Sequence, residues 1–324
     1  MKNILLAIIF LLLFTSCERR IPEPYYIDAV FIMDDDGSNL THLIDGTPGS
    51  VQFTPNDEKI IGVYSGIWSI NLDGSKFTYL VDSLSIDISL PVFSPDGSKI
   101  AFTSGDIFIM DIDGTNLQNL TNSPDVRDRY PHFSPDGDSL VYATDSDSET
   151  TISIIDKNGE NTRKVISKST EPYPCYYDYP RYNINGDKIY YNYLGEQRGL
   201  CSINADGTDN NLILGGYPEL YPASMSENGS KLVFSCDGHI YIMTTANNEI
   251  LDLGDGGHPV ISSDGIKIVY TIGNGYVYAM NSDGSEKKNL RYGNKPRFSW
   301  NPFGDNYKII FSGRREIKNK GILY

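Results

Sequence analysis

The chain has 324 residues, of which 27 are basic and 42 are acidic, so its formal net charge is −15. Nucleic-acid affinity depends on clustered Lys and Arg, so a chain this acidic excludes nucleic acid as a partner. The 23 Tyr and 30 Gly residues, with only 21% charged residues, are typical of many short strands joined by tight turns and argue against a disordered chain.

The first 16 residues, MKNILLAIIFLLLFTS, have the pattern of a secretory signal. Lys2 supplies a basic start, and Ile4–Phe14 is an apolar run of 11 residues, which is short for a membrane-spanning helix. Cys17 follows two small residues, so the stretch resembles the lipobox of bacterial lipoproteins, in which the Cys is acylated and becomes the first mature residue. We expect a lipoprotein signal peptide over 1–16, lipidation at Cys17 and a tether over 17–26; an ordinary signal with an incidental Cys is the alternative.

Beyond residue 26 the chain repeats two patterns in alternation. The first is a short strand, a Pro-Asp-Gly-type turn and a second strand, and its clearest copies are PVFSPDGSKIAF from Pro91 and PHFSPDGDSLVY from Pro131. Looser copies begin at Val51, Pro180, Met225, Pro259 and Pro296. Asp-Gly and Pro-Asp-Gly sequences supply the backbone angles that tight hairpin turns require, so each copy predicts a hairpin.

The second pattern is an apolar strand, an Asp-Gly turn and a weaker strand, as in IFIMDIDGTNLQNL from Ile107. Its other copies begin at Val30, Ile67, Ser153, Cys201, Ile240 and Val277. The turn glycines of the first pattern recur about every 41 residues between Gly97 and Gly304. Four strands in about 40 residues is the size of one β-propeller blade.

The apolar pattern favours a propeller over a sandwich. Ile107–Met110 is apolar on both faces of its strand, whereas a sandwich strand alternates apolar and polar residues. The chain begins with the second pattern and ends with the first, so six complete blades lie between two half-blades. We therefore predict an all-β fold over 27–324, a single seven-bladed β-propeller of four-stranded antiparallel blades closed by pairing of the N- and C-terminal segments. Six or eight blades are the alternatives, and Ile322–Tyr324 has no assigned place.

FSPDGSKIAF followed by IFIMDIDGTNLQNLT resembles the TolB-type, WD-repeat-like propeller repeat of bacterial envelope proteins. The resemblance covers about residues 27 to 324 and implies the propeller fold. It implies little about activity, because the matching residues build strands and turns. The same repeat occurs in prolyl-oligopeptidase-type enzymes, but the chain has no G-x-S-x-G motif of a hydrolase domain.

The best candidate for a binding surface lies at the channel mouth over the third and fourth blades, opposite the short Asp-Gly turns. Connections that depart from the shortest repeat commonly carry function, and these blades have the longest ones. Tyr and Arg are preferred anchors of binding surfaces. The candidate binding face comprises Arg127, Arg129, Tyr130, His132, Tyr173, Tyr176, Tyr177, Asp178, Tyr179, Arg181, Glu196 and Arg198. Alternatively, some of these Tyr rings only seal one blade against the next.

The search for catalytic residues gives no grouping. The four histidines are His42, His132, His239 and His258, and a metal-dependent lyase of the oligogalacturonate lyase family needs several His converging on the channel. We predict no catalytic residue, no metal and no cofactor. Cys175, Cys201 and Cys236 are expected as buried free thiols, with one disulfide in an oxidising envelope as the alternative.

Together these features predict a lipid-anchored propeller of the bacterial cell envelope that binds an envelope protein or peptide and touches the membrane only through its lipid. The alternative is a carbohydrate-binding or polysaccharide-cleaving propeller of the lyase type.

Overall fold

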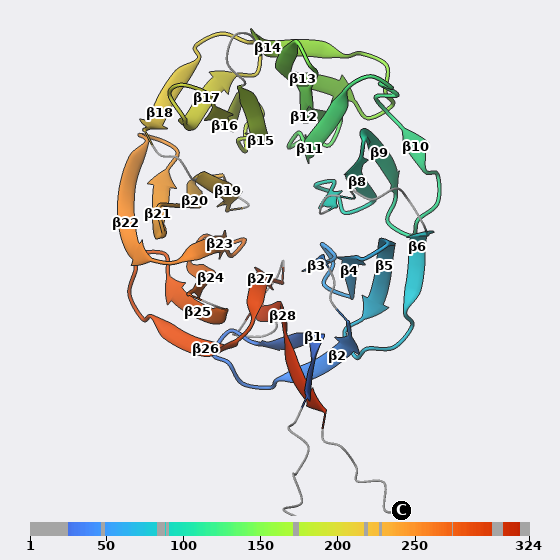
Figure 1. Ribbon diagram of the computed structural model, residues 1–324, viewed down its shortest axis with the longest axis vertical. Helices are drawn as coiled ribbons and strands as arrows, with labels where there is room; N and C mark the ends of the chain where they lie inside the picture. Colours follow the sequence, from blue (N-terminus) through green and yellow to red (C-terminus); the bar gives the residue numbers. More distant parts are fainter. Residues whose placement is uncertain are drawn as a thin grey trace, which may run out of the picture.

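The computed structural model describes residues 25–46, 49–82, 88, 91–170, 175–216, 220–226, 229–273, 275–299 and 307–317. Seven four-stranded sheets are arranged around a central opening (Figure 1). The predicted seven-bladed, all-β propeller is therefore confirmed. Cys17, Tyr173, Gly304 and Ile322–Tyr324 lie outside the described residues.

Six blades are formed by consecutive strands, with the first strand nearest the central opening and the fourth at the rim (Figure 1). Blade 1 comprises β3 (Ser50–Phe53), β4 (Lys59–Val63), β5 (Gly66–Asn71) and β6 (Thr78–Asp82), and blade 2 comprises β7 (Val92–Phe93), β8 (Lys99–Ser104), β9 (Asp106–Asp111) and β10 (Gln118–Asn119). Blade 3 comprises β11 (Arg127–Phe133), β12 (Ser139–Asp145), β13 (Glu149–Asp156) and β14 (Arg163–Ser169), and blade 4 comprises β15 (Tyr176–Tyr182), β16 (Lys188–Leu194), β17 (Gly199–Asn204) and β18 (Asn211–Gly215). Blade 5 comprises β19 (Leu220–Met225), β20 (Lys231–Cys236), β21 (His239–Thr244) and β22 (Glu249–Asp255), and blade 6 comprises β23 (Gly257–Ile261), β24 (Lys267–Ile272), β25 (Tyr276–Asn281) and β26 (Lys288–Tyr292). In the part of the chain that the structure describes, no helix is long and apolar enough to span a bilayer.

Blade 7 joins the two ends of the chain. It contains β27 (Asn294–Phe298) and β28 (Lys308–Ile317) from the C-terminal segment, and β1 (Tyr25–Asp34) and β2 (Thr41–Asp45) from the N-terminal segment. β1 pairs with β28 antiparallel over ten residue pairs, and the two strands lie side by side in Figure 1. The ring is thus closed by backbone hydrogen bonds between segments from opposite ends of the sequence, as the order of the two repeated patterns predicts.

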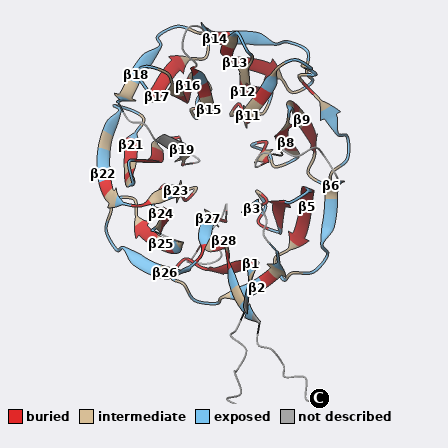
Figure 2. Cartoon of the chain, in the orientation of Figure 1, coloured by how far each residue is buried: buried red, intermediate tan, exposed pale blue. Residues whose placement is uncertain are grey.

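The hydrophobic core is divided into seven clusters, one at each interface between neighbouring blades. Between blades 2 and 3, for example, Ala101 and Ile107 pack with Phe133 and Leu140. Each inner strand lies between two such clusters, which explains why its residues are apolar on both faces. Figure 2 shows the result: buried residues fill the inner strands, and exposed residues dominate the outermost ones.

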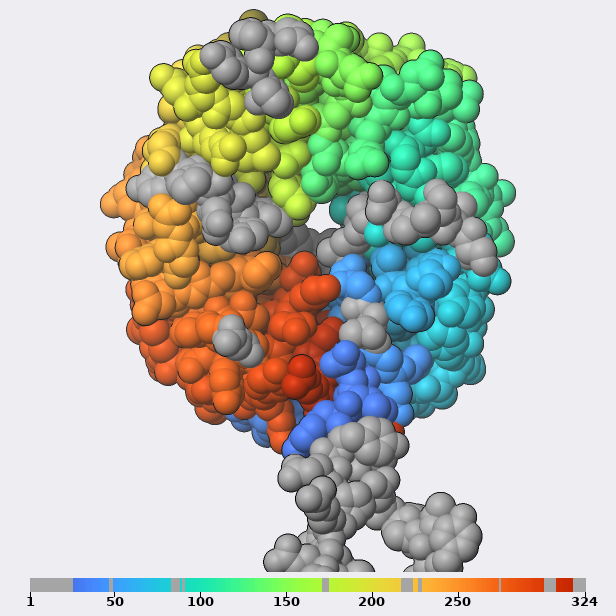
Figure 3. Space-filling view, viewed as in Figure 1, coloured from blue at the N-terminus to red at the C-terminus, as the bar shows by residue number. Residues whose placement is uncertain are grey.

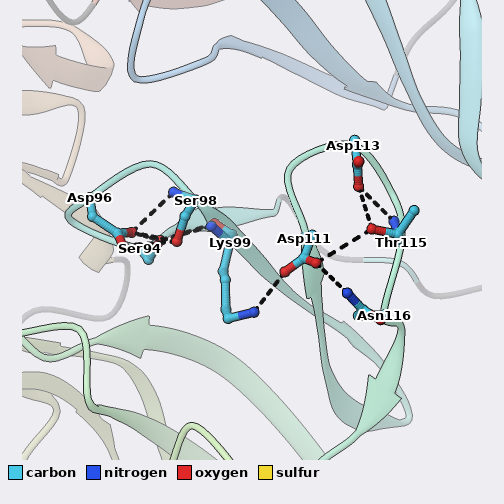
Figure 4. A network of polar contacts seen from close by, with 8 residues as sticks. All are labelled: Ser94, Asp96, Ser98, Lys99, Asp111, Asp113, Thr115 and Asn116. Carbon is cyan, nitrogen blue, oxygen red and sulfur yellow. Dashed lines mark hydrogen bonds and ion pairs between the residues drawn. The ribbon is translucent and has the colours of Figure 1, made fainter.

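The repeated Pro-Asp-Gly turns are held by their own Asp side chain, as blade 2 shows (Figure 4). Asp96 Oδ1 accepts hydrogen bonds from Ser94 Oγ at 2.5 Å and from the Ser98 backbone N–H at 3.0 Å. These bonds, led by that of Ser94, lower the pKa of Asp96 to about 2. The Asp of this repeat is therefore a turn-forming acceptor that stabilises the hairpin.

The second repeated turn works in the same way and is tied to the first. Asp113 Oδ1 accepts the Thr115 backbone N–H at 3.0 Å and the Thr115 hydroxyl at 2.6 Å. Lys99 Nζ and Asp111 Oδ1, 2.7 Å apart, connect the two hairpins of the blade (Figure 4). The repeated acidic residues thus have structural partners on this face of the ring.

The turn glycines also allow neighbouring blades to approach closely. Gly97 has a φ of +69°, and a Cβ built on it would lie 3.1 Å from Cβ of Pro55 in the preceding blade. Gly105, in the same blade, has a φ of +81° but nothing within 4 Å of such a Cβ. We expect Gly105→Ala to lower the free energy of unfolding by about 1–2 kcal/mol, the cost of a left-handed backbone for a residue with a Cβ. Gly97→Ala must also displace Pro55, so we expect it to lower the free energy of unfolding by more than Gly105→Ala does. Equal losses for the two variants in urea unfolding would show that this contact between blades is unimportant.

Candidate functional site

The N-terminal halves of the adjacent first strands β11 and β15 carry most of the predicted binding face. In each strand the pairing register shifts across a proline and the tyrosine before it, between Arg129 and His132 and between Asp178 and Arg181. The residues before these prolines, Tyr130 and Tyr179, have positive φ angles of 56° and 51°. Such a bulge bends a strand and changes the direction of a side chain. Equivalent register shifts occur in β19, β23 and β27, so the bulge recurs in the first strands of blades 3 to 7.

The two bulged tyrosines lie against each other. The ring centroids of Tyr130 and Tyr179 are 4.0 Å apart, with the ring planes inclined by 35°. The Arg129 guanidinium carbon lies 5.3 Å from the Tyr130 ring centroid, within the range of a cation–π contact. The pair therefore forms a fixed aromatic group that bridges blades 3 and 4.

Arg129 is held by two carboxylates. It forms an ion pair with Asp145 on β12, and its Nη2 lies 3.8 Å from Oδ1 of Asp178 on the neighbouring blade. Burial raises the pKa of Asp178, and the Arg129 charge opposes that rise. Arg129 and Asp178 thus connect the blades electrostatically, and Arg129 is already engaged by protein groups.

The remaining predicted face residues divide into buried and exposed groups. Tyr177 is only 3% exposed, and its ring lies 5.4 Å from that of Tyr191 and 5.8 Å from that of Tyr193. Tyr177 also belongs to the core cluster that contains Val141 and Ile152 of blade 3, so it packs between blades, as the alternative interpretation of the tyrosines expects. Tyr176, by contrast, is 40% exposed. Arg127, Glu196 and Arg198 are exposed as well, so they and Tyr176 are the outward-facing part of the predicted surface.

His132 and Arg181 belong to a second feature, a belt of residues around the channel. Each directly follows the proline of its first strand and precedes a buried aromatic residue. His132 is paired with Val141 on β12, and Arg181 is paired with Tyr190 on β16. The equivalent residues of all seven blades, here called the channel belt, are half-buried, and in every blade except blade 5 the residues on either side are buried. The channel belt comprises Gln52, Val92, His132, Arg181, Ser224, Val260 and Arg297.

The basic members of the channel belt influence one another. Burial, followed by the nearby Arg181 charge, lowers the pKa of His132 to about 3, so His132 is neutral at physiological pH. Burial and then the Arg181 charge lower the pKa of Arg297 to about 10. Arg297 was not among the predicted site residues. The sequence signal for it is the repeated Pro-x-aromatic unit of the first strands, PHF, PRY and PRF, whose middle residue is basic.

Among the described residues no three His, Cys, Asp or Glu side chains are grouped as a metal site would require. Cys175, Cys201 and Cys236 are buried and form no disulfide. This confirms the sequence prediction of buried thiols over the alternative of one disulfide.

Comparisons with known proteins agree with this architecture. A family model described as the TolB beta propeller domain matches residues 39–213, more than half of the chain. No curated protein matches the chain. Among solved structures, an oligogalacturonate lyase in complex with manganese superposes with a TM-score of 0.65 at 12% identity, covering 89% of this chain and 91% of that one. TolB from Acinetobacter baumannii superposes with a TM-score of 0.55 at 15% identity, covering 89% of this chain and 65% of that one. A putative TolB from Agrobacterium tumefaciens superposes with a TM-score of 0.53 at 15% identity, covering 90% of this chain and 100% of that one. These likenesses show the fold, and the family model shows that the chain belongs to the TolB beta-propeller family.

Proposed function

We propose that this chain is a non-catalytic binding module of the bacterial cell envelope, anchored by a lipid on Cys17, which binds a protein or peptide at the mouth over blades 3 and 4. The observation that carries the proposal is the preorganised aromatic and basic group of Arg129, Tyr130 and Tyr179 on two adjacent first strands. Because Arg129 is fixed by Asp145, little side-chain entropy is lost when a partner covers this surface.

The exposed residues around that group suit a protein interface. Tyr176 offers an accessible aromatic ring, and Arg127, Arg198 and Glu196 supply charges at the edge of the surface. Rigid aromatic anchors with a charged rim are the usual arrangement of protein interfaces. Membership of the TolB beta-propeller family and the lipobox-like sequence before Cys17 support an envelope location.

A carbohydrate-binding or carbohydrate-cleaving role is the second candidate. It is favoured by the basic channel belt, since uronic acid sugars carry carboxylates, and the propeller fold is shared with a solved oligogalacturonate lyase. Incubation with a panel of polysaccharides separates the two candidates: new unsaturated chain ends would favour the lyase-type role and contradict the non-catalytic proposal.

The protein-binding proposal predicts that one envelope protein is captured at Tyr176. A photo-crosslinking residue at position 176 in intact cells is expected to give one discrete adduct, because Tyr176 is exposed beside the aromatic group. The combined change Tyr176→Ala and Tyr179→Ala is expected to abolish capture through a crosslinker at the exposed Arg127 position. A crosslinker at Tyr79, 45% exposed on the outer strand β6, is the control and should give no such adduct. Equal capture at the positions of Tyr79 and Tyr176 would contradict the proposal.

A further inference from the structure

The second strand of blade 3 begins differently from those of the other blades. In those six blades its first residue is a lysine, and these lysines are Lys59, Lys99, Lys188, Lys231, Lys267 and Lys308. In blade 3 the strand β12 begins at Ser139 instead. Serine lacks the four-carbon stem and the ammonium group of lysine, so blade 3 lacks the contacts that these two parts of the side chain make elsewhere.

In blades 5 and 6 this lysine extends to the next blade. Lys231 Nζ donates to the Gly265 carbonyl at 2.9 Å and to Ser282 Oγ at 2.8 Å, and both acceptors belong to turns of blade 6. Lys267 makes a similar connection, because its Nζ lies 2.5 Å from Asp35 Oδ2 in a turn of blade 7. The lysine at this place therefore spans the space between neighbouring turns and supplies a positive charge there.

Blade 4 presents the same turns to blade 3. Gly186 matches Gly265, because the N–H of each donates to the carbonyl three residues earlier. Ala205 matches Ser282, because the N–H of each donates, at 2.7 Å, to the carbonyl of the residue after that glycine. Ser139, Gly186 and Ala205 line one cavity. The cavity thus corresponds to the place that the lysine side chain takes between blades 5 and 6.

This cavity has a volume of about 600 Å³, within the range of small-molecule sites. It lies between blades 3 and 4, which pack side by side in the ring (Figure 1) and in its space-filling view (Figure 3). Its lining residues Ser134, Asp136 and Gly186 belong to the turns that follow β11 and β15. The mouth surface is formed by the first halves of these strands, so the cavity lies at their opposite end.

The lining of the cavity combines apolar walls with a negative charge. Ile154 and Tyr182 are buried and form part of its walls. The Asp136 carboxylate accepts hydrogen bonds from Ser134 Oγ at 2.5 Å and from the Asp138 backbone N–H at 3.1 Å. These bonds, led by that of Ser134, lower the pKa of Asp136, so its carboxylate is ionised at physiological pH. Walls of this kind suit an alkyl stem, and a carboxylate suits an ammonium group.

We propose that this cavity binds a ligand with a primary ammonium group on an alkyl chain, in the place that the repeat gives to a lysine side chain. The alkyl chain packs on Ile154 and Tyr182, and the Asp136 carboxylate and the Gly186 carbonyl accept the ammonium group. A free diamine or a lysine of a partner protein can supply this group. The inference goes beyond the mouth surface, and either can fail without the other.

Arg163 is the cation among the lining residues, and it favours the opposite ligand class, an anion. Its side chain and that of Asp136 are both exposed, so solvent and salt screen the two charges, and neither alone determines the ligand. The repeat favours the ammonium group, because the matching places between blades 5 and 6 and between blades 6 and 7 hold the ammonium groups of Lys231 and Lys267.

The test is an NMR titration of the purified protein with cadaverine, a five-carbon diamine. We expect saturable binding, which Ser139→Lys should weaken about tenfold or more because the new side chain occupies the cavity and adds a like charge. Ala205→Ser restores the hydroxyl that Ser282 supplies to Lys231 and should strengthen binding about threefold or more. Ser98→Lys, the control, adds the same charge at an exposed position in blade 2 and should change the affinity less than about twofold.

A second measurement does not depend on the variants folding. In the unchanged protein, cadaverine should shift the amide signals of Gly186 and Ala205 but not those of Gly265 and Ser282, where Lys231 already occupies the matching place. N-acetyl-lysine methylamide, titrated in parallel, identifies the source: tighter binding than cadaverine supports a lysine of a partner protein, and weaker binding supports a free amine.

Glutarate, a dicarboxylate of the same length as cadaverine, tests the opposite ligand class. We expect it to bind more weakly than cadaverine. The proposal is overturned if glutarate binds more tightly, because Arg163 would then make the cavity an anion site. It is overturned equally if cadaverine does not bind, if it leaves the Gly186 and Ala205 signals unshifted, or if Ser139→Lys binds it as tightly as the unchanged protein.

Discussion

Phe311→Ala is expected to lower the free energy of unfolding by about 3–5 kcal/mol, the usual cost of truncating a fully buried Phe. Phe311 is 1% exposed on β28, and its ring is stacked on Phe31 of β1 at 5.6 Å. The substitution therefore leaves a cavity where the two ends of the chain meet. Because the described residues close the ring through non-covalent contacts of blade 7, we expect the loss to appear as cooperative unfolding at lower urea concentration.

Phe77→Ala is the matched control for that prediction. Phe77 also belongs to an aromatic pair, 5.4 Å from Trp68, but it is 41% exposed on the outer side of blade 1. Its truncation should cost less than about 1 kcal/mol, since little buried surface is lost. Similar losses for the two variants would contradict the conclusion that blade 7 depends on tight packing between the chain ends.

The blade count and the closure were predictable because they depend on local signals. Each hairpin carries its own Asp-Gly turn, and Asp96 and Asp113 show that the Asp side chain forms the turn. The same signals recur in every blade, so errors in one copy do not change the count. The order of the two patterns at the chain ends then determines that β1 and β28 share a blade.

The site was only partly predictable, because its contacts join residues far apart in the sequence. Tyr176 and Tyr177 are neighbours of the same type, yet one is exposed and the other buried, since adjacent strand residues point to opposite faces. The pairing of Arg129 with Asp145 and Asp178 depends on how blades 3 and 4 meet. Arg297 and Arg181 are far apart in the sequence, and they share the channel belt because the blades close into a ring. Aligning the repeats by their prolines would have placed Arg297 in the channel belt.

Replacing Arg129 with Gln is expected to lower the free energy of unfolding by about 2–4 kcal/mol at pH 7.5, because Asp178 and Asp145 lose the charge that compensates their burial. The loss should depend on pH in a defined direction. Burial raises the pKa of Asp178, and removal of Arg129 raises it further. A carboxyl group whose pKa is higher in the folded protein stabilises the fold below its unfolded pKa of about 3.9, and that stabilisation disappears as the pH rises through the folded pKa. The deficit of the variant should therefore be smallest near pH 4 and grow toward pH 7.5.

Urea unfolding at a series of pH values measures this dependence, and two further variants identify its origin. Arg127→Gln removes the same charge two residues earlier, from an exposed position, and should lower stability by less than about 0.5 kcal/mol at every pH. Adding Asp178→Asn to the Arg129→Gln protein should restore part of the lost stability at pH 7.5, because the amide is uncharged and needs no counter-ion. A deficit that is constant with pH, or that Asp178→Asn leaves unchanged, would mean that Arg129 acts through packing on Tyr130 rather than by balancing the buried carboxylate between blades 3 and 4.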